Sequence, residues 1–105
     1  MRLYIEKKSV RSDGTCCIRV YEQINRKSIR VSTGLYVKPE YWDSFAQRVK
    51  GGKDAKMLNN ALSAIANRVS SDIFNAKASG KVAEIDNDFI TAAIAGRDIS
   101  RKEEL

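Results

Sequence analysis

Alternating apolar and polar positions dominate the first third of the chain and predict β-strands. Residues 3–8, 15–24 and 28–33 repeat with a period of two, which places successive side chains on opposite faces of a strand. In the longest strand, one face takes Cys16, Ile18, Val20 and Ile24, and the other takes Cys17, Arg19, Tyr21 and Gln23. In the third strand, Ile29 and Val31 go inward, and Ser28, Arg30 and Ser32 go outward. The pattern predicts a sheet with one apolar and one polar face.

Short polar turns separate these strands. Residues 11–14, Arg-Ser-Asp-Gly, are a turn signal in which Gly14 accepts a positive φ. Residues 25–27, Asn-Arg-Lys, are a second signal, in which Asn25 tolerates the left-handed region. Because such short connections join neighbouring antiparallel strands, the three strands are expected to form an antiparallel meander.

The hydrophobic period changes to three and four residues in the second half and predicts two helices. Residues 54–78 carry one apolar stripe, formed by Leu58, Leu62, Ile65, Val69 and Ile73 and widened by Ala61, Ala66 and Ala76; Lys56, Asn60, Asn67, Arg68 and Ser71 lie opposite. Asp86 is a predicted N-cap for a shorter helix through Ala95, with Gly96 just past its end. The predicted fold class is α+β: a three-stranded antiparallel sheet packed against one long helix, with a short additional helix.

The segment between the last strand and the long helix is predicted to form a rigid corner. Gly34 interrupts the ladder, and Pro39, the only proline, suits the first position of a short helical turn. Trp42, the only tryptophan, is expected to be buried under the helix. We therefore interpret Gly34, Pro39 and Trp42 as structural anchors.

The helix breaker Ser79-Gly80 suggests a division of the chain. Residues 1–80 are expected to form the main domain, and residues 81–105 a short helix and a linker. The segment 97–105 is charged and has no hydrophobic periodicity, which is typical of a linker or of the start of a further domain.

Positive charge is concentrated in the front half. Residues 1–56 carry 13 Lys and Arg against 6 Asp and Glu, a net charge of +7, whereas residues 57–105 carry 6 against 7. Such asymmetry favours a polyanionic partner, and nucleic acid before membrane, because no basic amphipathic helix accompanies it. The alternative is a soluble domain with a lysine-rich surface.

The sequence gives little support for catalysis or for a cofactor. It contains no His and no Gly-rich phosphate loop, and Cys16 and Cys17 are adjacent, so neither a zinc site nor a bridge between them is expected. Asp86 and Asp88 are better explained by a helix cap than by a metal. We expect no catalytic residue, no cofactor, no metal and no small-molecule substrate. No apolar run is long enough to cross a membrane and no signal peptide is recognisable, so the cytoplasm is the expected location.

The polar face of the predicted sheet is the candidate binding surface. A two- or three-stranded sheet can enter the major groove of double-stranded DNA and direct its outward side chains to base edges. The side chains predicted to contact bases are Arg19, Tyr21, Gln23, Arg30 and Ser32. Those predicted to contact phosphates lie at strand ends and turns: Lys7, Lys8, Arg11, Arg26 and Lys27.

The order of motifs resembles that of a known family. The matching segments are Asp13-Gly14, Ser32-Thr33-Gly34, Val37-Lys38-Pro39, Trp42-Asp43, Arg48-Val49-Lys50-Gly51 and Leu58-Asn59-Asn60-Ala61-Leu62. Over residues 3–78, the chain resembles the N-terminal arm-type DNA-binding domain of tyrosine recombinases, the phage-type integrases of mobile elements. The resemblance implies a sheet placed in the major groove of arm-type sites, in support of integration or excision. It also implies recombinase subunits as partners, and a separate catalytic domain beyond a core-binding domain that this chain lacks.

Two other functions compete with DNA reading. The apolar faces of the helices could dock a neighbouring subunit, which would make the chain a protein-interaction or oligomerisation module. The sheet could instead bind RNA, a mode that usually needs several outward aromatic side chains for base stacking. Only Tyr21 and Tyr4 are candidates for that role in the predicted sheet.

Overall fold

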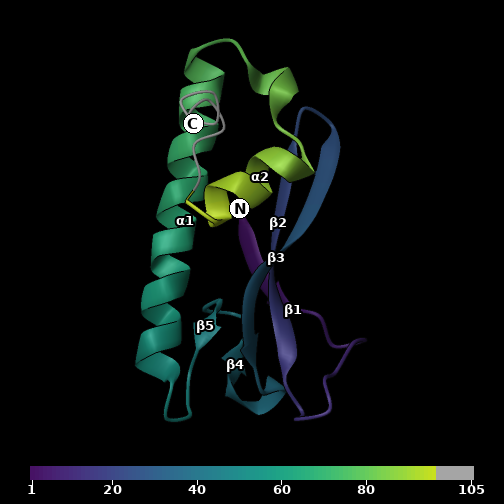
Figure 1. Cartoon of the computed structure of the whole chain (residues 1–105), viewed down its shortest axis with the longest axis vertical. Coiled ribbons are helices and arrows are strands. Elements are labelled where there is room, and N and C mark those ends of the chain that lie inside the picture. The colour runs from purple at the N-terminus through teal and green to yellow at the C-terminus, as the bar shows by residue number, and fades with distance from the viewer. Residues whose placement is uncertain (97–105) are drawn as a thin grey trace, which may run out of the picture.

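The computed structural model describes residues 1–96 and has the predicted α+β fold. The predicted linker at 97–105 lies outside the described residues. Figure 1 shows a three-stranded sheet beside one long helix, α1, with a second helix, α2, packed in the space between them. The order of elements along the chain is β1, β2, β3, the 3₁₀ helix η1, β4, β5, α1, the 3₁₀ helix η2 and α2.

The main sheet has the predicted antiparallel order β1-β2-β3, with β2 in the centre. Its strands are β1 (Arg2–Ile5), β2 (Cys16–Ile24) and β3 (Lys27–Val37). The first strand was expected over residues 3–8 but ends at Ile5. The chain leaves β2 after one further backbone bond, from the Glu6 N–H to the Cys17 carbonyl at 2.9 Å. Residues 6–15 therefore form a loop. The prediction ran into this loop because alternation of apolar and polar residues alone does not show where the strand ends.

The third strand is longer than predicted, because Gly34 bends the ladder without ending it. Cys17 pairs with Tyr36 and Arg19 pairs with Ser32, so Ile18 alone lies opposite residues 33–35. The Thr33 hydroxyl donates to the Ile18 carbonyl at 2.6 Å and replaces a ladder bond. Gly34 has φ +78°, a value that costs a glycine little and strains other residues. This bulge lets the strand continue to Val37.

The inward face of the sheet forms the core, with the facing predicted from the sequence. Cys16, Ile18 and Val20 have no exposed surface, and the inward side chains of β1 and β3 are also buried. They join one cluster with Trp42 and with the apolar stripes of both helices. Cores built from such alternating side chains depend on a covering layer, which α1 and α2 supply.

The long helix α1 (Ala55–Ala78) and the short helix α2 (Asn87–Ile94) lie close to the predicted positions. The Asp86 carboxylate caps α2, because it accepts the Phe89 N–H at 2.9 Å. Between the helices, η2 (Val82–Glu84) packs against α1, and Ile85 after it is fully buried. Arg68, expected on the solvated face of α1, instead reaches α2 and donates to the carbonyls of residues 93 and 94. These bonds add to the backbone hydrogen bonds at the end of α2, where the carbonyl of residue 93 also accepts the Gly96 N–H at 3.1 Å.

A second small sheet in the corner region was not predicted. Strands β4 (Trp42–Asp43) and β5 (Arg48–Val49) follow η1 (Pro39–Tyr41) and form a two-stranded hairpin beside the start of α1. The Asn59 side chain on α1 holds β5, because it accepts the Val49 N–H and donates to the Val49 carbonyl, both at 2.8 Å. Two-residue strands carry no readable periodicity, which is why sequence reasoning missed them.

Candidate nucleic-acid interface

The outward face of the main sheet is an ordered array of polar and aromatic side chains. Antiparallel register places directly opposed residues on the same face. The pairing therefore defines four rows across the sheet: Cys17 with Tyr36; Tyr4, Arg19 and Ser32; Arg2, Tyr21 and Arg30; and Gln23 with Ser28. All five predicted base-contacting residues lie in these rows, and Arg19 and Arg30 come from adjacent rows on the face opposite the core.

Arg30 is held in position by Tyr21. The centre of the Arg30 guanidinium lies 4.6 Å from the centroid of the Tyr21 ring, a cation–π geometry. The Tyr21 hydroxyl donates to the Gln23 side-chain carbonyl at 3.3 Å, which fixes the ring along β2. Arg30 is exposed and Tyr21 is half-buried. Tyr21 thus acts as a platform for the arginine, a role that its outward facing alone did not reveal.

Arg19 lies partly against the sheet. Its Nη2 donates to the Arg30 carbonyl oxygen at 3.4 Å, so the side chain crosses from β2 to β3. Its Nε is buried and has no hydrogen-bond partner among residues 1–96. An unpartnered buried donor is costly. A small movement of this side chain toward an acceptor on a ligand would remove that cost.

Ser32 has a local structural role in addition to its outward position. Its hydroxyl lies 2.9 Å from the Cys17 thiol and accepts the Gly34 N–H at 3.0 Å. The hydroxyl therefore supports the bulge of β3. Its predicted contact with a base stays a prediction, and such a contact would compete with the bond to Gly34.

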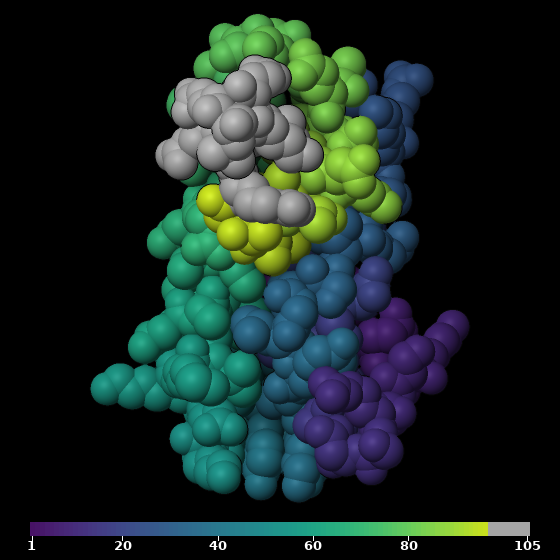
Figure 2. Space-filling model, viewed as in Figure 1, coloured from purple at the N-terminus to yellow at the C-terminus, as the bar shows by residue number. Residues whose placement is uncertain are grey.

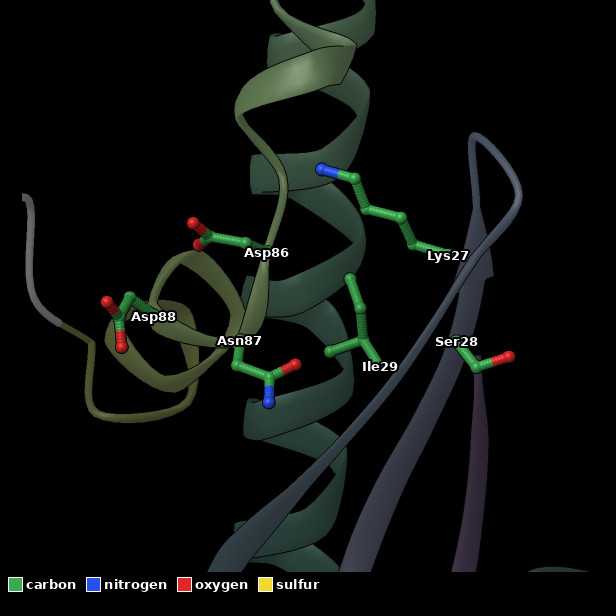
Figure 3. Close-up of a pocket in the computed structure, with 6 residues that line it drawn as sticks. All are labelled: Lys27, Ser28, Ile29, Asp86, Asn87 and Asp88. Atoms are coloured by element: carbon green, nitrogen blue, oxygen red, sulfur yellow. The ribbon is translucent and has the colours of Figure 1, made fainter.

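The predicted phosphate-contacting residues lie at the two ends of the sheet. Lys7, Lys8 and Arg11 are exposed in the loop between β1 and β2, and Arg26 is exposed at the tip of the β2–β3 hairpin with φ +65°. Lys27 differs from these, because its Nζ donates to the Ala83 carbonyl at 3.4 Å. Figure 3 shows this side chain directed toward the segment that leads into α2, on the side where Asp86 and Asp88 lie.

A comparison with known families identifies the domain. A model of the Arm DNA-binding domain family matches residues 3–93, which include α1 and nearly all of the main sheet and α2. The chain belongs to this family. The arm domain is the DNA-binding domain typical of phage integrases. No curated protein and no solved structure matches the sequence.

The outward face of the arm domain includes three large side chains that were not predicted as DNA contacts. Arg2 extends the alternation of β1 by one residue, and Tyr4 lies next to Arg19. Tyr36 continues the alternation of β3 past the bulge and is exposed. The alternation of residues 35–37 in the sequence already places Tyr36 outward. This reading was missed because the third strand was predicted to end before Gly34.

Other kinds of site are not evident in the described part of the arm domain. Neither α1 nor α2 is both long and apolar enough to cross a membrane. Within residues 1–96, no three His, Cys, Asp or Glu side chains gather in a way that could hold a metal ion. Cys16 is buried and Cys17 half-buried, and both are free thiols.

Proposed function

We propose that this arm domain is the DNA-binding module of a tyrosine recombinase and that it reads arm-type sites with its main sheet in the major groove. The observation that carries the proposal is the position of Arg19 and Arg30 in adjacent rows of the outward face, with Tyr21 beneath Arg30. Arginine binds the two acceptors of guanine with its planar fork, which makes it the commonest side chain for reading that base.

The two arginines divide the reading between neighbouring rows. Arg30 is presented at the surface on an aromatic platform, and Arg19 lies one row away with a donor that has no partner within residues 1–96. Gln23 and Ser32 flank them. The Gln23 amide suits a paired contact to adenine, and the Ser32 hydroxyl can bind either a donor or an acceptor on a base edge. Basic residues at both ends of the sheet would lie over the phosphates and fix the register.

The covalent chemistry of recombination is assigned to another part of the parent protein. The arm domain would hold the recombinase on flanking sites and help to assemble the complex with other subunits during integration or excision of mobile DNA. It would act in the cytoplasm. Residues 81–105 would lead toward the core-binding domain.

Titration of labelled duplex DNA, single-stranded DNA and RNA at two salt concentrations tests the proposal. We expect a preference for duplex and, for about five phosphate contacts, a log–log salt slope of about −4.5. Replacing Arg19 or Arg30 by Ala should relax sequence preference, whereas replacing a phosphate contact such as Arg26 should weaken all duplexes alike. An equal loss on every sequence for all these variants would contradict base reading.

The two competing functions give different results in the same experiment. Self-association that is insensitive to salt, without duplex binding, would favour an interaction module. Most of the apolar stripe predicted for α1 is buried in the core and is not available to such a partner, although Met57 and Phe74 of the same helix are exposed. Preference for RNA would favour base stacking, and the outward tyrosines of the sheet would then be the contacts.

A further inference from the structure

The outward face of the sheet continues around the end where β1, β2 and the loop between them meet. Arg11 in that loop lies over the Tyr36 ring, with 4.1 Å between the guanidinium carbon and the ring centroid. Tyr36 belongs to the row beside Arg19 and Ser32. Figure 2 shows the purple loop next to the blue segment at the lower end of the molecule. A second arginine–tyrosine pair therefore marks the boundary of the outward face.

Beyond Tyr36, the surface forms an open hollow of about 440 Å³ between the end of β3 and the start of α1. Lys38 and Lys53 both line it and both are exposed, and Thr15 contributes a hydroxyl. Tyr41 forms part of its wall. An added Cβ at Gly51 or Gly52 would come within 3.2 or 3.0 Å of that ring, so the two glycines let the chain pass close to the tyrosine.

The charge of this end contrasts with that of the opposite end. The lining of the hollow holds two lysines and one acidic residue, Asp54, and the exposed Lys50 precedes the lining residue Gly51 in the chain. At the other end, the pocket between β3 and α2 is lined by Asp86 and Asp88 with a single lysine, as Figure 3 shows. A phosphodiester backbone is attracted to the hollow and repelled from the pocket beside α2.

We propose that the hollow between β3 and α1 binds the sugar-phosphate backbone of the duplex whose major groove receives the sheet. The contacting side chains are Arg11, Lys38, Lys50 and Lys53, all outside the base-reading rows. This proposal rests on the proposed function and adds a backbone contact at the end with the β1–β2 loop, beyond the contacts proposed for Arg26 and the other turn residues. The three lysines were not predicted as contacts, because they lie outside the predicted strands and turns.

A matched pair of double variants tests the placement. Lys38→Gln with Lys53→Gln removes two charges from the hollow, and Lys77→Gln with Lys81→Gln removes two from exposed positions at the far end of α1. Because the net charge falls equally, any difference in duplex binding is local. We expect the salt slope of the hollow variant to be shallower than that of the wild type by about 1.8. The ratio of wild-type affinity to variant affinity should then fall about twelvefold as the salt rises from about 50 to about 200 mM. The control should change little.

The outcomes separate this proposal from the broader one. Equal losses in the two double variants, or none in the hollow variant, would overturn the phosphate site while leaving base reading by Arg30 intact. Failure of the wild-type chain to bind duplex would instead remove the proposed function. Protection of lysines from reductive methylation provides a second readout on the wild-type protein, so it does not depend on variant folding. Duplex should protect Lys53 and leave Lys81 reactive, and the reverse pattern would refute the placement.

Discussion

The two faces of β2 show how one strand serves two purposes. On the inward face, Ile18 and Val20 have no exposed surface and belong to the core. On the outward face, Arg19 and Tyr21 remain partly exposed and contact the side chain or backbone of Arg30. Alternate residues along the same backbone therefore carry the stability of the fold and the chemistry of the surface.

The rigid core fixes the geometry of the proposed binding face. Side chains in a close-packed interior have few alternatives, so the backbone of β2 is fixed from below. An outward arginine on such a strand starts from a defined position, and an aromatic neighbour restricts it further. Binding then requires less loss of side-chain entropy than binding through a flexible loop.

The largest effect is expected from the inward face. Replacing Ile18 by Ala removes buried methyl groups from the centre of the core and should lower the free energy of unfolding by about 2–5 kcal/mol. Urea denaturation monitored by Trp42 fluorescence measures this change. Replacing Arg19 by Ala is the control on the next residue and should cost far less. A similar loss of unfolding free energy in both variants would contradict the conclusion that only the inward face of β2 carries the stability of the fold.

The next effect is expected from Arg30. Replacing it by Ala should cost about 1–3 kcal/mol of discrimination between the cognate site and a site with the wrong base. Arg30→Lys is the matched variant, because it keeps the charge and loses the planar fork. Competition binding should show that the lysine variant retains general duplex affinity and loses the base preference. Full preference in the lysine variant would argue against a paired contact to guanine.

A smaller effect is expected from the platform beneath Arg30. Replacing Tyr21 by Ala removes the ring and should weaken specific binding by about two- to fivefold, the equivalent of an exposed cation–π contact. Tyr21→Phe keeps the ring and loses only the hydroxyl bond to Gln23, so it should retain most of the affinity. If the phenylalanine variant binds as weakly as the alanine variant, the hydroxyl and not the platform is the important group.

The smallest effect concerns the loop that joins the strands β1 and β2. Hydrogen bonds from the Thr15 hydroxyl and backbone N–H to the Asp13 carboxylate lower the pKa of that group. A lowered folded-state pKa contributes stability that is present above the ordinary aspartate pKa of about 3.9 and is lost as the pH falls through the folded value. An NMR titration should give a midpoint below the ordinary value, and Thr15→Val should raise it. An unchanged midpoint in the variant would assign the shift to another group.

Much of the fold and part of the site could be predicted from local patterns. Alternation in residues 16–24 predicted which side chains enter the core, and Asp86 predicted the start of α2. Tyr21 and Arg30 were predicted to face outward for the same reason. These features depend on residues close in sequence, because strand period, helix period and capping are local properties of the backbone.

Local patterns in the sequence are sufficient to predict the facing of the sheet, the two helices and the basic front half. The contacts of Asn59 with β5, of Arg68 with the end of α2 and of Tyr21 with Arg30 depend on how the chain packs. The first two are contacts between a side chain and a distant backbone, and the third joins neighbouring strands through their register. Periodicity determines the side of an element on which a residue lies, but the partner it meets there depends on how the whole chain packs.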